Sequence, residues 1–125
     1  MTTLPTTKAL GDAAEARALA HLEAAGLVLV RRNYRVARGP RARGGEVDLI
    51  MNDRDGTLVF VEVRVRVDRR FGGAAASIGA AKRRSLVFAA SHFVRGLRAP
   101  PPCRFDVVAI DGERIEWLRA AFDAG

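Results

Sequence analysis

A run of alternating valines constrains the fold of this chain more than any other feature of its sequence. In "LVFVEVRVRV", residues 58–67, a valine occupies every second position from Val59 to Val67. Alternate side chains of a β-strand point to the same face, so these valines share one face, which we expect to be buried under a helix. The other face begins apolar and ends charged, in the order Leu58, Phe60, Glu62, Arg64 and Arg66.

A second strand precedes this run across a short turn. "EVDLIM", residues 46–51, is followed by "NDRDG", whose composition is typical of a β-hairpin turn. If the two strands pair antiparallel, Asp48 and Glu62 lie on one face near the same end of the hairpin. An extended strand also places Asp48 opposite an apolar face formed by Val47, Leu49 and Met51.

These strand carboxylates have two interpretations. In the first, they are solvated residues that pair with neighbouring arginines. In the second, Asp48 and Glu62 would repel each other unless a cation lies between them. Hard divalent cations such as Mg²⁺ are bound in this way, by one or two carboxylates together with water and phosphate oxygens.

The rest of the chain supplies two helices and three more strands. The composition of residues 8–25 predicts a helix that ends at Gly26. Residues 74–95 are expected to form a second helix, which ends before "RAPPP". Residues 27–36, "CRFDVVAI" and "RIEWL" predict strands. The expected order is helix, three strands, helix, two strands. We expect one α/β domain over residues 1–125, with its core at about 8–122 and a mixed sheet covered by helices.

Each predicted helix carries one charged residue within its apolar stripe. Glu15 is in phase with Leu19 and Leu22, and Lys82 is in phase with Leu86 and other apolar residues. A lone buried charge is costly, so each needs a partner or a wet cleft. Both could be structural, as snorkelling side chains or as a Glu15–Lys82 ion pair. Alternatively, both helices line one acidic, metal-binding cleft.

The charge balance favours a polyanionic partner, most commonly nucleic acid. The net charge is +7, and all basic residues are arginines except Lys8 and Lys82. So strong a preference for arginine over lysine makes the high isoelectric point weaker evidence for a nucleic-acid partner. It also suggests that a lysine that remains has a role that arginine cannot fill.

A basic connection, "RRNYRVARGPRARGG" at residues 31–45, overlaps the end of the first predicted strand and continues beyond it. It can be read as a flexible arm across a phosphate backbone, or as a solvated hairpin tip. Tyr34 is the only aromatic residue among its arginines, so the sequence lends little support to base stacking. The arginines that we expect to contact nucleic acid, from this connection and the valine strand, are Arg32, Arg35, Arg38, Arg41, Arg43 and Arg66.

The sequence also bears on where the protein works. No apolar run approaches the roughly 18 residues that are needed to span a bilayer. The N-terminal residues lack the pattern of a signal peptide, and Cys103 has no second cysteine for an internal disulfide. We therefore expect a cytoplasmic protein without a membrane partner.

Together these motifs resemble the YraN-like family of uncharacterised bacterial proteins. The resemblance runs from about Gly11 to Phe122 and includes "GGEVDLI", "LVFVEVRVR", "FGG" and "RFDVVAI". That family is similar to the PD-(D/E)xK restriction-endonuclease-like nucleases and to Holliday junction resolvases. The resemblance implies a three-layer sandwich with a central mixed sheet. It also implies a Mg²⁺- or Mn²⁺-dependent endonuclease acting on DNA, including branched or damaged DNA.

The resemblance also assigns roles to single residues. Asp48 corresponds to the first metal-binding acid and Glu62 to the acid of the E-x-K motif. The Val63 carbonyl would also bind the metal. Glu15 would complete the site, and Glu46 would be a flanking acid.

Arg64 stands where this motif has its lysine. An arginine can stabilise negative charge, but it stays protonated and cannot act as a base. Lys82, on the following helix, is a second candidate to supply the catalytic ammonium.

Two other kinds of function remain open. The chain could be a nucleic-acid-binding module that keeps the nuclease fold without turnover. It could also be an interaction subunit for an acidic protein. A resolvase-like activity would favour a homodimer, because a four-way junction presents two strands to cut.

Overall fold

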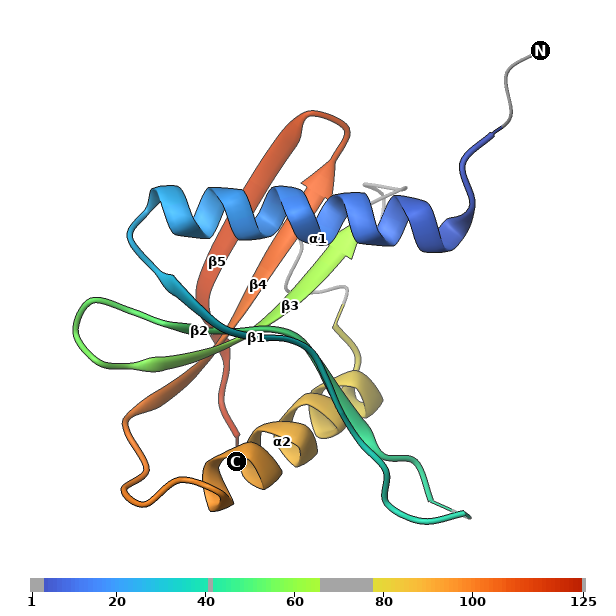
Figure 1. The fold of residues 1–125 in the computed structure, drawn as a ribbon. Helices are drawn as coiled ribbons and strands as arrows, with labels where there is room; N and C mark the ends of the chain where they lie inside the picture. Colours follow the sequence, from blue (N-terminus) through green and yellow to red (C-terminus); the bar gives the residue numbers. More distant parts are fainter. Residues whose placement is uncertain (1–3, 41, 66–77, 125) are drawn as a thin grey trace.

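The computed structural model describes residues 4–40, 42–65 and 78–124. Its helices and strands are α1 (Thr7–Ala24), β1 (Val28–Val36), β2 (Gly45–Asn52), β3 (Leu58–Val65), α2 (Ala80–Arg95), β4 (Cys103–Asp111) and β5 (Arg114–Phe122). The helix α1 lies across one face of the sheet and α2 lies across the other (Figure 1). The predicted α/β class and element order are therefore confirmed, and the three layers are consistent with a nuclease-like sandwich. No described helix is both long and apolar enough to cross a bilayer.

The five strands follow their order in the chain, β1-β2-β3-β4-β5. Only β3 and β4 are parallel, and the other three neighbouring pairs are antiparallel. Parallel strands require a crossover connection, and this one contains α2. The predicted hairpin joins β2 to β3, where the Asp53 N–H donates to the Thr57 carbonyl at 2.9 Å. Gly56 adopts φ 87° in this turn, a conformation that favours glycine.

Two hydrophobic cores separate the layers. Under α1, Ala18 and Leu22 pack on Val59 and Val61, as the alternating valines predict. Burial stops before the strand ends, because Val65 is 50% exposed. The pairing of β2 with β3 covers Leu49–Asn52 and Leu58–Val61, so among the described strands the end of β3 has only β4 beside it. Val67, which we expected on the same face, lies outside the described residues.

The strand β2 changes phase at Asp48. Val47 packs in the core under α2, whereas Leu49 and Met51 pack in the core under α1. The prediction that these three residues share one face was therefore wrong. Beside this point β1 also departs from regular geometry, since Asn33 has φ 50°. The change of phase leaves the Asp48 side chain directed at β3.

Two element boundaries also differ from the prediction. The second helix starts at Ala80 rather than residue 74, with Gly79 in an extended conformation at its N-cap. Helix propensity alone favoured an earlier start, although residues 74–77 lie outside the described part of the chain. At the other end, β5 continues past Leu118 to Phe122, because a register shift lets Phe122 pair with Phe105.

A close approach between β2 and α2 depends on Gly45. A Cβ atom at this position would overlap the Ser85 carbonyl oxygen and lie 2.9 Å from the Ala89 nitrogen. Next to it, the Glu46 N–H donates to Ser85 Oγ at 3.3 Å. The glycine thus lets the strand that carries Glu46 and Asp48 lie directly against α2.

We expect Gly45→Ala to destabilise the protein by about 1–3 kcal/mol, because one of the two backbones must move. Thermal denaturation would measure this. Gly11→Ala is the matched control, since in the described part of the chain no atom other than those of its chain neighbours and the nearby α1 backbone lies within 4 Å of the new Cβ. That change should instead raise stability by about 0.5–1 kcal/mol. Equal effects of the two substitutions would contradict the packing argument.

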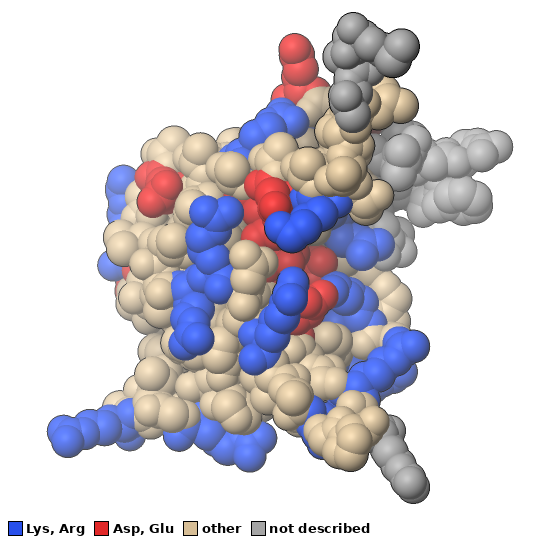
Figure 2. Space-filling model, turned by 45° about the vertical axis from the view of Figure 1, so that its right-hand side comes forward, with Lys and Arg blue, Asp and Glu red and all other residues tan. Residues whose placement is uncertain are grey.

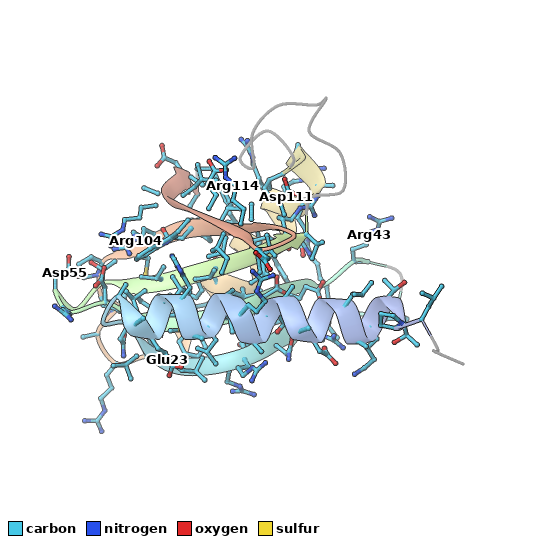
Figure 3. The ribbon with its side chains drawn as sticks, turned by 90° about the horizontal axis from the view of Figure 1, so that it is seen from above. Glu23, Arg43, Asp55, Arg104, Asp111 and Arg114 are labelled. Atoms are coloured by element: carbon cyan, nitrogen blue, oxygen red, sulfur yellow. The ribbon has the colours of Figure 1, made fainter. Side chains whose placement is uncertain are left out.

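A buried polar network is centred on Asp106 of β4. Asp106 is 1% exposed and accepts hydrogen bonds from Arg104 Nε, Trp117 Nε1 and the Ala120 N–H. Arg104 also donates to Asp53 at 2.8 Å, which places it beside the β2–β3 turn (Figure 3). We had assigned no role to Asp106 from the sequence. Its contacts tie β4 to β5 and to the β2–β3 turn.

Candidate acidic site and basic groove

The carboxyl groups of Asp48 and Glu62 meet on the β2–β3 hairpin. The antiparallel register places Leu49 opposite Val61, so the next positions, Asp48 and Glu62, adjoin. The Val63 N–H donates to Asp48 Oδ2 at 2.8 Å. The same register would pair Val63 with residue 47, so the Asp48 side chain accepts an N–H that a backbone carbonyl would otherwise take. The two carboxyl groups are also hydrogen-bonded to each other.

Burial controls the protonation of this pair. Burial and the neighbouring Asp48 charge raise the pKa of Glu62 to about 8, and its side chain is 5% exposed. Burial also raises the pKa of Asp48, although the Val63 N–H and the Lys82 charge oppose this effect. The mutual hydrogen bond favours the proton on Glu62. At neutral pH the pair therefore holds one proton, with Glu62 as donor and Asp48 as carboxylate.

Lys82 reaches this pair from α2. Its Nζ donates to Glu46 Oε1 at 3.2 Å and lies 3.5 Å from Glu62 Oε2. Burial lowers the pKa of Lys82, but the charges of Glu62 and Glu46 more than offset it and the net shift is upward. Glu46 is also 3.4 Å from Arg35 Nε. Lys82 thus pairs with these two acids rather than with Glu15, and a charged ammonium lies beside the shared proton.

Glu15 approaches the pair from α1. Burial and the Asp48 charge raise its pKa, and the Arg32 charge opposes the rise. Among the described residues, its Oε1 atom is buried and accepts no hydrogen bond. The same holds for Glu62 Oε2, although Lys82 is nearby. Two buried carboxyl oxygens without a hydrogen bond are unusual, and a bound cation would satisfy them.

The donor set fits a hard divalent cation. All the side chains involved offer oxygen, which suits Mg²⁺ or Mn²⁺ better than softer metals. Within residues 4–40, 42–65 and 78–124, no group of three or more His, Cys, Asp or Glu side chains is arranged to hold a metal. A cation here would therefore rely on one or two carboxylates, with water and phosphate oxygens as its other ligands. Mg²⁺ commonly binds in this manner.

The strand residue Arg64 adjoins this cluster. It is half-buried, and its charge acts to lower the pKa of Glu62. Two cationic residues, Arg64 and Lys82, therefore influence the same carboxyl group. Val63 joins the site through its N–H, and the metal-binding role of its carbonyl stays a prediction.

The predicted nucleic-acid arginines divide into three sets. Arg32 and Arg35 are close enough to the acids to act on the pKa of Glu15. Arg38 and Arg43 line a groove beside the site. Arg41 and Arg66 lie outside the described residues. Figure 2 shows acidic side chains near the middle of one face, with Lys and Arg side chains on either side.

The groove lies between α2 and the connection from β1 to β2. Its cavity volume is about 670 Å³. It is lined by Arg38, Arg43, Gly44, Ala81, Lys82, Arg84, Ser85 and Phe88. Since Lys82 also contacts Glu46 and Glu62, the groove leads to the carboxyl pair.

Sequence reasoning missed Phe88 and Ser85, which belong to this groove. Phe88 lies outside the apolar stripe that buries Leu86 and Ala89, yet it carries a large aromatic ring. An aromatic residue away from the buried face of a helix that is rich in arginine was the available signal. Ser85 offered none, because its contact with Glu46 depends on how α2 docks on β2.

The pKa of Glu62 predicts how stability depends on pH. Its pKa is raised from 4.5 to about 8 on folding, so the folded chain binds more protons within that interval. The free energy of unfolding should therefore fall as pH rises from about 4.5 to about 8, and level off above. Denaturant titrations across this range would measure it. Glu62→Gln should flatten the curve, and an unchanged slope in that variant would contradict the assignment.

Comparison with known proteins finds close relatives. Residues 14–110, from α1 to β4, match a family described as "Uncharacterised protein family UPF0102". The chain is 66% identical over 119 residues to a UPF0102 protein of Methylibium petroleiphilum, which covers 95% of this chain and 98% of that protein. It is 63% identical over 120 residues to a UPF0102 protein of Paracidovorax citrulli, covering 96% of this chain and 87% of that protein.

Proposed function

Since the chain belongs to the uncharacterised protein family UPF0102, whose description names no activity, we propose its function from the site itself. We propose a Mg²⁺- or Mn²⁺-dependent endonuclease that hydrolyses phosphodiester bonds of DNA. One observation carries the proposal. The carboxyl groups of Asp48 and Glu62 meet on the β2–β3 hairpin, with the Lys82 ammonium 3.5 Å from Glu62, at a point where a basic groove reaches them.

Each residue has a part in this reaction. Asp48 and Glu62 would hold the cation together with the Val63 carbonyl, while Glu15 and Glu46 would add negative charge nearby. The cation would lower the pKa of a bound water and offset the negative charge of the transition state. The proton that the pair shares must leave before both carboxyl groups can bind as anions.

The two cationic residues divide the role of the motif lysine. Lys82, with its ammonium 3.5 Å from Glu62, is placed to orient the attacking water and to stabilise negative charge. Arg64 adds positive charge to the same site without acting as a base. This division would explain how the site tolerates arginine within the strand.

The surroundings of the site favour DNA as substrate. Arg38, Arg43 and Arg84 line the groove that leads to it, and such side chains contact phosphate groups irrespective of sequence. With this function we expect a cytoplasmic protein. We also expect a homodimer if four-way junctions are the substrate.

The test is strand cleavage by the purified protein. Labelled linear, flapped, single-stranded and four-way-junction DNA would be incubated with Mg²⁺, Mn²⁺ or EDTA. We expect cleavage with either cation and none with EDTA. Binding of every DNA without cleavage under any condition would overturn the proposal.

A binding module with the nuclease fold is the second candidate, and Arg64 favours it. Guanidinium spreads its charge over a planar fork, so it replaces a compact ammonium poorly at a reacting phosphate. The Arg64→Lys variant distinguishes an active enzyme from a binding module. In an active enzyme it should change the cleavage rate, and an increase would show that arginine limits turnover. In a binding module it should leave DNA affinity nearly unchanged and create no cleavage.

A further inference from the structure

The basic groove continues past the carboxyl pair along α2. A second hollow of about 600 Å³ shares Arg38, Arg84 and Phe88 with the first. It extends along the helix to Arg95. From Lys82 to Arg95 the helix rises about 20 Å, at 1.5 Å per residue. The two hollows therefore form one track along α2, which begins at Lys82 and passes over Phe88.

The charge of this track is strongly positive. Among the described residues, the lining of the first hollow contains Arg38, Arg43, Lys82 and Arg84 and no acid. The second adds Arg83 and Arg95, with Asp123 as its single described acid. Arg43 extends outward from the connection between β1 and β2 (Figure 3). A polyanion is the ligand that suits such a lining.

An aromatic ring lies where the two hollows join. Phe88 is partly buried, and the Arg38 guanidinium lies 5.0 Å from the centroid of its ring. Arginine and an aromatic ring stacked in this way are planar groups on which nucleic-acid bases can stack. Base stacking had little support from the sequence, because Tyr34 is the only aromatic residue of the basic connection. Phe88 and Arg38 are far apart in the chain and meet only in the fold.

We propose that this track binds a single strand of DNA and stacks one of its bases on Phe88. In a duplex the faces of the bases are covered by their neighbours, so an unpaired strand is required to present a base to the ring. Because the track ends at Lys82, a strand bound there would lead toward Asp48 and Glu62. The proposal rests on the proposed function for its ligand and narrows the substrate to DNA with an unpaired segment.

Fluorescence anisotropy with a short labelled oligothymidylate, in EDTA, tests binding without cleavage. Phe88→Leu keeps an apolar side chain but removes the ring, and should weaken single-strand binding about tenfold or more. Phe88→Tyr keeps the ring and should bind like the wild type. Duplex affinity should change less than about twofold in both variants, since phosphate contacts carry it.

Arg119→Ala is the matched control. Arg119 also lies over an aromatic ring, 4.1 Å from the centroid of Trp117, but on β5 rather than α2. Its loss should leave single-strand affinity nearly unchanged. Wild-type affinity in Phe88→Leu, or an equal loss in Arg119→Ala, would overturn the proposal.

Photocrosslinking of the wild-type protein decides the matter if Phe88→Leu does not fold. An iodouracil-substituted oligonucleotide should crosslink to the peptide that contains Phe88, and crosslinks confined to other peptides would overturn the proposal.

The outcomes of these experiments distinguish the single-strand track from the proposed nuclease. Single-strand binding through Phe88 without any cleavage would refute the nuclease alone. Cleavage of DNA with no effect of Phe88 on binding would refute the single-strand track alone.

Discussion

Glu62→Gln is expected to reduce metal-dependent DNA cleavage by about a thousandfold or more. Removing one preorganised electrostatic group from an active site can already cost about 10²–10³ in rate. This substitution also removes a cation ligand, because an amide cannot ionise. The fold should survive, since Glu62 is largely protonated at neutral pH and glutamine resembles that neutral form. Single-turnover cleavage rates with Mg²⁺ or Mn²⁺ would measure the effect.

An exposed glutamate on α1 provides the control. Glu23 lies on the solvent side of α1 (Figure 3), so Glu23→Gln removes one charge without touching the site. It should cleave DNA at the wild-type rate. If Glu62→Gln retained wild-type cleavage while folded, the carboxyl pair would not be the catalytic centre.

The largest effect on stability is expected from Asp106→Ala. The change would leave Arg104 and the Trp117 and Ala120 N–H groups without their shared acceptor inside the protein. Removing one partner of a buried ion pair typically costs about 3–5 kcal/mol. For a domain of this size, the corresponding fall in melting temperature is roughly 10–20 °C. Calorimetry or thermal circular dichroism would measure it.

Asp12→Ala is the comparison for this stability test. Asp12 forms a 3.1 Å ion pair with Lys8, but both side chains are exposed, at 59% and 87%. Such surface pairs contribute about 0–1 kcal/mol, so the melting temperature should hardly move. Similar losses in the two variants would mean that burial of Asp106 is not what makes it stabilising.

Local patterns were enough to predict the carboxyl pair. Asp48 accepts a hydrogen bond from the Val63 N–H, and the two residues are only 15 positions apart, on the two arms of one hairpin. The alternating apolar residues and the composition of the turn predicted both strands and their antiparallel pairing. Where the alternation failed, at Val47, the cause was the docking of α2 on the start of β2.

The groove could not be derived in the same way. Lys82 and Glu46 are 36 residues apart in the chain. Their contact depends on how closely α2 approaches Gly45. Helical phase predicted that Lys82 faces the sheet, but it did not predict which acid the lysine would meet. The start of α2 was misplaced for a related reason. Alanine-rich sequence favours helix everywhere, whereas Gly79 and the packing of Ile78 set the actual boundary.

The irregularity of β1 has a consequence for how copies of the chain meet. β1 lies at an edge of the sheet, and such an edge can pair with a strand of another molecule and start aggregation. Here the register shifts between Leu29 and Arg31, and Asn33 has a positive φ, so the edge is a poor template. Arg32 and Arg35 add mutual repulsion between copies. The arginines proposed to contact DNA would therefore also oppose edge-to-edge pairing of two copies through β1, and replacing them with neutral residues should reduce the solubility of the protein.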